Sequence, residues 1–548
     1  MLSKSEKHNL LGQDDVQGKT NSPPSPPPPP PVSEKISPLG DGFFKENKAI
    51  PTKTAREFYH TESTVTTTTS YTTSGLNRDL KRLVIIAAAT AATLGYDVGI
   101  MAAAIQPLQA QLNLTSVQKE FAMGSLNFVA AAGALLGGNF ANGQGRKPTI
   151  QLCGWLFIAG TLLMALAPDY WVLLLGRIVT GLGVGVSFVV APVFLSEVAP
   201  TDQRGSLNTV FDVAINGGIL MGYIVGFLVE LSPIPDDLKW RVMLGMGILL
   251  PILVLYNLAL LPESPRYLVM KNQPDEAHQV LEQLGSEDAA STVASIQDEL
   301  DNESSATPGF REIISNVAHL SVGMKLALGL GFWQQVTGTE AVLYYSADFL
   351  EQAGLASPTQ RLLGNCFVGL CKLTPELIAM RVVDRIGRRP LMLGSALSLC
   401  ISTFLLGTAF FFSWSPVLVV LLLCAVMASF SLGLGPFTFL VASEMLGLSE
   451  RATGMTLCAA VNRSTSGLVA LTAVSLNEAL GGSGFFFLYA MIGFVSLPYY
   501  STQLPETSGV SLEELAARNR GEVGIEASPR NNTLSKIDER KRLGQNTV

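Results

Sequence analysis

The sequence is poor in charged residues, which account for 15% of its 548 residues, compared with about 25% in average soluble proteins. Hydrophobic residues account for 48%. The formal net charge of -7 comes from acidic loops and tails, whereas basic residues stand beside the hydrophobic segments, so no nucleic-acid partner is expected. This composition argues against a soluble protein and favours one embedded in a lipid bilayer.

Cysteine and histidine are also scarce, with six and four residues. All six cysteines lie within or at the edge of hydrophobic segments and none forms a CxxC pair, so we expect neither a disulfide nor a metal site. The histidines fall in the N-terminal tail or in segments expected to be cytoplasmic, which argues against a histidine proton relay in the membrane. Because no nucleophile and base pair or phosphate-binding loop is present either, we expect no enzymatic activity and no cofactor.

Residues 1–79 have the composition of a disordered cytoplasmic tail, rich in Ser, Thr, Pro and charge. The proline run from Pro26 to Pro31 is either a polyproline spacer or a ligand for an SH3-type domain. No hydrophobic signal peptide occurs in this tail, so the first hydrophobic segment is expected to anchor the chain.

Hydrophobic stretches of about 20 residues recur from Leu83 onward, and this is the length that a helix needs to cross a hydrocarbon layer about 30 Å thick. We count twelve of them and therefore predict an all-α membrane protein. They span residues 83–103, 121–141, 149–167, 171–194, 208–230, 242–261, 324–350, 361–381, 390–412, 416–441, 452–477 and 483–503.

A polar stretch from Glu263 to His319 divides the twelve segments into two sets of six, and its helical spacing predicts cytoplasmic helices between them. The two sets share internal repeats: GQGRKP after the second segment matches DRIGRRP after the eighth, and SEVAPTDQRG matches SEMLGLSERATG. We therefore expect an N-terminal half at 80–261, a linker at 262–320, a C-terminal half at 321–504 and a cytoplasmic tail at 505–548.

Basic residues mark one side of the expected membrane protein. Those that flank loops on this side are Lys81, Arg82, Arg146, Lys147, Arg204, Arg385, Arg388, Arg389 and Arg451. The positive-inside rule makes this side cytoplasmic and places both termini there. Asn113 then lies in the first external loop, where Asn113-Leu114-Thr115 is a candidate glycosylation site. We expect a monomer in the plasma membrane, with a vacuolar or other internal membrane as the alternative.

Several motifs follow one another in order along the chain. They are GRxxxGxG from Gly176, PxxxxExxPxxxRG from Pro192, PESPRxL from Pro262, DRxGRR from Asp384 and PETxG from Pro505. Between Leu83 and Leu515 the chain resembles the sugar porter family of the major facilitator superfamily in all of them. The resemblance implies two six-helix halves with a substrate site between them near the middle of the membrane.

Within that family the chain is most similar to the polyol and inositol proton symporters, because of Asp212, Glu340 and Asn462 followed by Arg463. It departs from the family where Asn142 and Gly143 replace an Asp-Arg pair and where Phe439 replaces a tryptophan. The resemblance implies a secondary transporter that moves a polyol or monosaccharide by alternating access, driven by protons. A facilitative hexose uniporter and a non-transporting sugar sensor are the alternatives.

The stretch from Gly331 to Ser346, GFWQQVTGTEAVLYYS, is the most unusual part of the chain because it places amides, a carboxylate and phenols in a hydrophobic segment. An unpaired buried amide costs about 1–3 kcal/mol, and ionisable residues within membranes usually face a pathway. Amides that link helices are the alternative explanation. Amides suit hydroxyl groups because both donate and accept hydrogen bonds. The candidate substrate-binding residues are Gln334, Gln335, Glu340, Tyr345, Asp212, Phe439 and Asn462.

Asp97 lies in the middle of the first hydrophobic segment, and Arg177 in the fourth segment is its expected partner. A carboxylate inside a membrane is costly unless it is paired or neutral. A pair that separates could therefore load and release a proton, and the resemblance favours this coupling role. A static structural ion pair is the alternative.

A set of charged residues recurs at matched places on the basic side of both halves. Its members are Glu197, Arg204, Arg146, Asp384, Arg388, Glu444 and Arg451. We expect them to form ion pairs between the halves that close the cytoplasmic side when the substrate site faces outward, and that break during each transport cycle. Ordinary anchoring by basic residues would explain the arginines but not the two glutamates.

Overall fold

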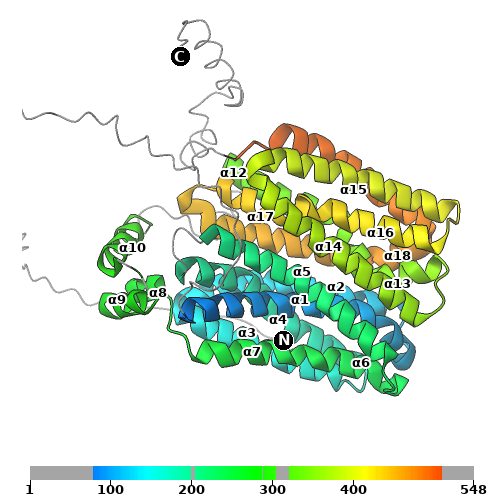
Figure 1. Ribbon diagram of the computed structural model, residues 1–548, viewed down its shortest axis with the longest axis horizontal. Helices are drawn as coiled ribbons and strands as arrows, with labels where there is room; N and C mark the ends of the chain where they lie inside the picture. The colour runs from blue at the N-terminus through cyan, green and yellow to red at the C-terminus, as the bar shows by residue number, and fades with distance from the viewer. Residues whose placement is uncertain (1–77, 199–203, 285, 287, 304–319, 509–548) are drawn as a thin grey trace, which may run out of the picture. The chain divides into compact units, whose positions relative to one another are not determined.

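The computed structural model describes residues 78–198, 204–284, 286, 288–303 and 320–508 (Figure 1). The predicted N-terminal tail lies outside these residues except for Arg78 and Asp79, which are helical, and most of the predicted C-terminal tail also lies outside them. The described residues form helices and no strands, as the sequence predicts.

The first half of the chain folds into six membrane-length elements. These are α1 (Arg78–Leu112), α2 (Ser116–Gln144), α3 (Arg146–Ala165), α4 (Tyr170–Val198), α5 (Arg204–Leu231), and α6 (Asp236–Gly245) with η2 (Met246–Ile248) and α7 (Leu249–Ala259) in one run. Helix α1 extends beyond its predicted end at 103. Its added turns contain three glutamines, and two of them, Gln106 and Gln109, line a cavity.

Three short helices follow in the described part of the chain before the second half begins. They are α8 (Pro265–Met270), α9 (Pro274–Gln283) and α10 (Ala289–Glu303). Ser264 caps α8 by accepting a hydrogen bond from the backbone N–H of Tyr267, and Pro265 occupies the first turn, where no N–H is needed.

The second half repeats the long helices of the first, with two of them broken. It consists of α12 (Val322–Val336), α13 (Thr339–Gln352), α14 (Pro358–Ile386), α15 (Arg388–Phe411), α16 (Pro416–Ser431), α17 (Leu434–Met445) and α18 (Leu448–Gln503). The breaks lie at Gly338, whose φ of 83° is left-handed, and at Gly433.

The described helices account for the twelve predicted crossings. Among the residues that the structure describes, nine spans are long and hydrophobic enough to cross a membrane by themselves. One of these, within α18, has 54 residues, far more than a layer about 30 Å thick requires, and Gly481 (φ 70°) divides it in two. The other crossings are the broken α12–α13 pair and α14, which is less hydrophobic because it contains Lys372 and Glu376.

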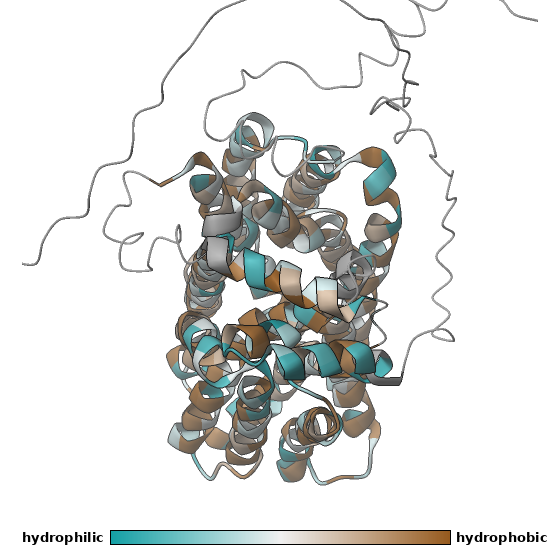
Figure 2. Ribbon diagram, turned by 90° about the vertical axis from the view of Figure 1, so that its left-hand side faces the viewer, coloured by the Kyte–Doolittle hydropathy of each residue, from teal (hydrophilic) through white to brown (hydrophobic). Residues whose placement is uncertain are grey.

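The two halves lie against each other with α2 beside α18 and α5 beside α14 (Figure 1). Close approach depends on small residues: a Cβ on Gly124 of α2 would lie 2.9 Å from the backbone nitrogen of Leu471 in α18. Large hydrophobic side chains such as Trp171, Tyr256 and Phe411 are exposed, and Figure 2 shows hydrophobic residues on the outer sides of the helices. Such a surface suits lipid rather than water.

Candidate functional site

The amides of the unusual stretch meet where two broken helices come together. Gln334, near the end of α12, donates from Nε2 to the backbone oxygens of Leu434 at 2.7 Å and Gly435 at 3.1 Å. These carbonyls belong to the first turn of α17. The Gln334 side chain therefore ties the break in the α12–α13 pair to the break between α16 and α17.

Asn462 of α18 joins both glutamines. Its Nδ2 donates to Gln334 Oε1 at 2.6 Å, and its Oδ1 accepts from Gln335 Nε2 at 3.2 Å. Arg463 also donates to this Oδ1, from Nη2 at 2.7 Å. The hydrogen-bonding capacity of Gln334 and Asn462 is thus largely used within the protein, whereas Gln335 Oε1 is buried without a partner.

Glu340 and Arg463 form a loose ion contact next to the amides. The distance from Arg463 Nη2 to Glu340 Oε1 is 4.0 Å. The Arg463 guanidinium also lies 5.2 Å from the ring centroid of Phe188 in α4. Phe188 in turn makes an edge-to-face contact with Phe439, with 5.3 Å between ring centroids. Phe439 is therefore an aromatic contact between the halves close to Arg463.

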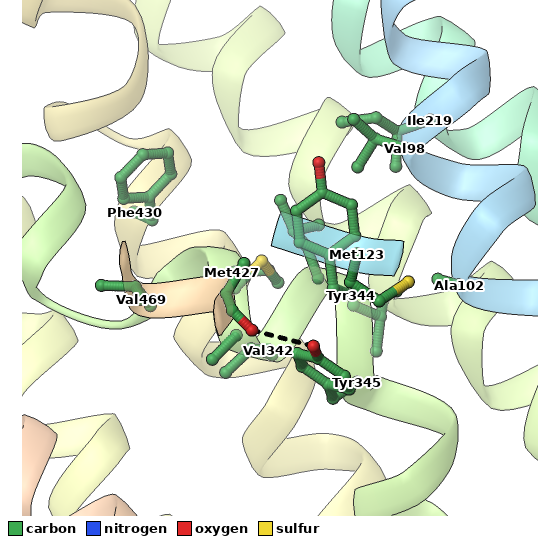
Figure 3. Close-up of a cluster of buried hydrophobic side chains, with 14 of the residues drawn as sticks. Val98, Ala102, Met123, Ile219, Val342, Tyr344, Tyr345, Met427, Phe430 and Val469 are labelled. Atoms are coloured by element: carbon green, nitrogen blue, oxygen red, sulfur yellow. Dashed lines mark hydrogen bonds between the residues drawn. The ribbon is translucent and has the colours of Figure 1, made fainter. Parts of the chain in front are cut away.

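Tyr345 lies apart from the amides. Its hydroxyl donates to the backbone oxygen of Ala470 at 2.8 Å, as the dashed line in Figure 3 marks, and Lys119 Nζ lies 6.0 Å from its ring centroid. Tyr345 also lines the cavity at the α1–α2 end of the bundle. These contacts differ from the expected role in the amide cage. The reason is local, because the chain is kinked at Tyr345 (φ -115°, ψ 16°).

Asp212 of α5 belongs to a group of charges that sequence reasoning identified only in part. The charged groups within electrostatic range of Lys372 of α14 include Glu376, Glu340, Asp212 and Arg463. Glu376 accepts a hydrogen bond from Asn216 Nδ2 of α5, so this bond crosses between the halves.

The sequence analysis missed Lys372, Glu376 and Asn216. A signal existed, because Lys372 and Glu376 stand four residues apart in the predicted segment 361–381 and so share one side of the helix. Ionisable residues within a membrane segment indicate function by default.

Asp97 and Arg177 form the expected ion pair, with 2.6 Å between Asp97 Oδ2 and Arg177 Nη1. The Arg177 side chain is fully buried. Its remaining donors reach the backbone oxygens of Ala122 at 2.7 Å and Met123 at 3.1 Å. The pair therefore joins α1, α2 and α4 inside the first half, where water does not screen it.

The matched charges near the DRxGRR repeat pair within each half in this conformation. Arg146 binds Glu197 through two bonds of 2.7 and 2.8 Å, and Ser264 donates to the same carboxylate at 2.6 Å. In the second half, Arg388 Nη2 lies 3.6 Å from Glu444 Oε1. In each half an arginine that begins one helix thus contacts a glutamate near the end of another, and the expected ion pairs between the halves stay a prediction for the outward-facing state.

The other members of the predicted gate also pair locally. Asp384 lies 3.4 Å from Arg388 Nη1. Arg451 donates to the backbone oxygen of Leu446 at 3.3 Å. Arg204 is the first residue of α5, and its side chain lies outside the described residues.

Each half also uses a glutamate to hold the start of a helix. Glu263 accepts from the backbone N–H groups of Arg146 and Lys147, both at 3.1 Å, at the start of α3. Glu506 accepts from the N–H of Arg388 at 3.0 Å, at the start of α15. A carboxylate at a helix N-terminus satisfies free donors and the helix dipole. The PESPRxL and PETxG motifs thus have equivalent roles.

A cavity of about 940 Å³ lies between the halves at the end where α1 meets α2. We call it the vestibule. The residues that line it and bear on its chemistry are Gln106, Asn113, Lys119, Lys239, Tyr345, Asp348, Glu351, Arg361 and Glu478. Among the residues that the structure describes, no group of His, Cys, Asp or Glu could hold a metal ion, and all six cysteines are free.

Comparison with protein families gives a match over most of the chain. The model described as "Sugar (and other) transporter" matches residues 83–518. Probable polyol transporter 4 of Arabidopsis thaliana is 35% identical over 436 residues, which cover 78% of this chain and 82% of the relative. The D-xylose transporter of Levilactobacillus brevis is 29% identical over 438 residues, covering 79% and 94%.

Solved structures show the same fold. The proton:xylose symporter XylE, bound to 6-bromo-6-deoxy-D-glucose, is 25% identical with a TM-score of 0.69 and covers 80% of this chain and 99% of its own. The inward-open conformation of XylE from E. coli gives a TM-score of 0.70 at 24% identity, with the same coverage. The order of motifs, the twelve crossings and these matches agree, and the chain belongs to the sugar transporter family of the major facilitator superfamily.

Proposed function

We propose that this transporter moves a neutral polyol by alternating access and carries a proton with it. The observation that supports the substrate class is a buried acceptor without a partner next to a loosely paired carboxylate at the broken α12–α13 pair. Gln335 Oε1 is buried without a partner, and Glu340 Oε1 makes a long ion contact of 4.0 Å with Arg463 Nη2. Polyol hydroxyls would donate to both.

The balance of acceptors favours polyols over pyranoses. A linear polyol or an inositol offers a hydroxyl donor on every carbon, whereas a pyranose also presents a ring oxygen that only accepts. The carboxylates of Glu340 and Asp212 accept hydrogen bonds and therefore favour a linear polyol or an inositol. Relatives that are named polyol transporters agree with this assignment. Gln334 and Asn462 complete the proposed site by fixing the positions of Gln335 and Arg463, and Phe439 supplies an aromatic side.

Proton coupling is assigned to Asp97 and Arg177. A proton on Asp97 would neutralise the carboxylate and weaken its 2.6 Å contact with Arg177. Arg177 would then keep only its two backbone acceptors. A change in this pair can alter how α1 packs against α4, and α1 also contacts α13 of the other half. A named relative in structure, XylE, is described as a proton:xylose symporter.

The charged residues near the DRxGRR repeat are proposed to act in gating through ion pairs within each half. Arg146 with Glu197 and Arg388 with Glu444 would hold the helices of each half together while the halves move against each other. Arg204, Asp384 and Arg451 are included in this set by their position. The proposed halves are 80–261 and 321–504, joined by the linker 262–320.

The orientation follows from the positive-inside rule. We place the Arg146 and Arg388 end of the bundle in the cytoplasm. An even number of crossings then puts both termini there, and Asn113 and the vestibule face outward. Asn113 remains a candidate for glycosylation. We propose a monomer in the plasma membrane.

The test is an uptake panel in a host that lacks its own transporters. Labelled sorbitol, mannitol, myo-inositol, glucose and xylose are each supplied at two external pH values. We expect a polyol to be taken up faster at acid pH and to compete as well as or better than glucose. Strong glucose uptake without polyol competition would indicate a hexose carrier instead. An uptake rate that changes neither with external pH nor with a protonophore would indicate a facilitator.

A further inference from the structure

The outer ends of the two halves are joined by an ion network that the sequence motifs did not reveal. Lys119 of α2 lies 2.7 Å from Asp348 Oδ2 of α13, and their side chains are 7% and 18% exposed. Lys119 belongs to the first half and Asp348 to the second. This is therefore a largely buried ion pair between the halves, in contrast to the pairs of Arg146 and Arg388, which lie within one half.

Further polar contacts converge on the same pair. Gln106 of α1 donates from Nε2 to Asp348 Oδ1 at 2.8 Å and to Glu351 Oε2 at 2.9 Å. Arg361 of α14 lies 2.6 Å from Glu351 Oε2. The Asp348 carboxylate thus has both oxygens engaged by the first half. We call Gln106, Lys119, Asp348, Glu351 and Arg361 the outer network.

A second contact between halves lies beside the outer network. Glu120, the residue after Lys119, accepts from the backbone N–H and the hydroxyl of Ser475 in α18, each at 2.7 Å. The Glu120 residue is buried. Helix α2 is therefore held to both α13 and α18 at this level.

The outer network borders the vestibule and includes residues of the helix that carries Glu340. Lys119, Asp348, Glu351 and Arg361 all line the vestibule. Along α13, Asp348 is eight positions beyond Glu340, which is about 12 Å at the usual rise of about 1.5 Å per residue. The contacts between α2 and α13 therefore lie at the vestibule end of the helix that leads to Glu340.

We propose that the outer network is the external gate of this transporter, with the Lys119–Asp348 pair as its central contact. The inference rests on the proposed alternating access. In the present conformation the network holds α13 against α1 and α2. Opening separates Lys119 from Asp348 and Gln106 from both acidic residues. Each charge then faces the water of the vestibule, which compensates the lost contact.

Helix α13 has the local structure that such a gate requires. It is separated from α12 at Thr337 and Gly338, and its own backbone departs from helical angles at Tyr345. A segment bounded in this way can change its direction without moving α12. Asp348 and Glu351 lie beyond both points and would move with it.

The experiment measures access to the site from outside, so it needs no transported substrate. Ser466 of α18 is fully buried, lies one turn from Asn462, and its hydroxyl has no partner. We use Ser466→Cys as a reporter in the full chain. It is labelled in intact cells with a membrane-impermeant maleimide and compared with the chain that lacks this cysteine.

Lys119→Met and Asp348→Asn should each raise the outside labelling rate of the reporter at least ten-fold. The double variant should raise it no further, because both changes remove the same contact. The charge exchange Lys119→Asp with Asp348→Lys should return the rate toward that of the parent. This exchange also serves if a single variant fails to reach the membrane.

Lys239→Met is the matched control. Lys239 lines the same vestibule, but its partners Glu230 and Asp236 belong to its own half. Its loss should leave labelling unchanged. Unchanged labelling in both gate variants would overturn the proposal, and so would an equal increase in the control. A failure of polyol uptake would refute the proposed substrate but would not alter this result.

Discussion

Replacement of Asp97 by Asn tests the coupling assignment most directly. The amide has nearly the same shape as the carboxylate but carries no charge and cannot load a proton at physiological pH. Arg177 is fully buried and 2.6 Å from Asp97, so the variant leaves its charge with only neutral partners. Breaking a buried ion pair usually costs about 3–5 kcal/mol, and we expect the lower end because two backbone oxygens remain bound to Arg177.

The transport result follows from the size of the driving force. A difference of one pH unit supplies about 1.4 kcal/mol per proton, which is enough for about ten-fold accumulation with one proton per substrate. We expect the parent protein in vesicles, acid outside and without a membrane potential, to approach this ratio. The Asp97→Asn variant should stop near equal concentrations while still exchanging labelled for unlabelled substrate.

A matched control and a clear contrary result complete the test. Asp169→Asn makes the same chemical change at a residue whose carboxylate accepts from the N–H groups of Trp171 and Val172 at the start of α4. It should leave accumulation intact. If the Asp97 variant still concentrates substrate to the parent's ratio, Asp97 is not the coupling group and the reasoning from burial is wrong.

Three further predictions concern the site and its supports. Glu340→Asn should weaken polyol binding by one or two decades, since a hydrogen bond to a charged group contributes about 1.5–3 kcal/mol, and should weaken hexose binding less. Competition assays with both ligands measure the two losses of affinity. Equal losses would argue against the polyol assignment. Gly387→Ala should lower the melting temperature, because φ is 96° there and the added Cβ would lie 2.5 Å from Glu506 Oε2. Gly394→Ala should not lower it, because a Cβ at Gly394 would meet open space. Equal melting temperatures of the two variants would refute the steric argument. Glu197→Gln should destabilise the detergent-solubilised protein more than Glu444→Gln, because Glu197 holds Arg146 at 2.7 Å while Glu444 is 3.6 Å from Arg388; the reverse order of melting temperatures would contradict it.

The broken helix shows where sequence reasoning succeeded and where it ended. The odd composition of Gly331 to Ser346 pointed to a special position, and the structure does bring Gln334, Gln335 and Asn462 together. The sequence could not show that Gln334 donates hydrogen bonds to the carbonyls of Leu434 and Gly435, which are about a hundred residues away. Contacts at that separation depend on how helices pack.

Tyr345, Glu197 and Glu444 illustrate a second limit of sequence reasoning. Tyr345 falls within the stretch that the sequence singled out, but a kink turns it toward Ala470 and Lys119. Glu197 and Glu444 were correctly matched with basic loops, yet both pair within their own halves. Sequence repeats reveal that two residues are equivalent. They do not reveal which neighbour each one binds.

The amino-acid sequence alone determined the class of the protein, its twelve crossings and its division into halves. These features depend on segment length and hydrophobicity, because a bilayer forces each crossing to satisfy its backbone hydrogen bonds locally in a helix. Only the tertiary structure decided that Lys372 and Glu376 come within electrostatic range of Asp212, and that Lys119 meets Asp348 between the halves. Such pairings arise from the packing of helices far apart in the chain, and no local pattern records them.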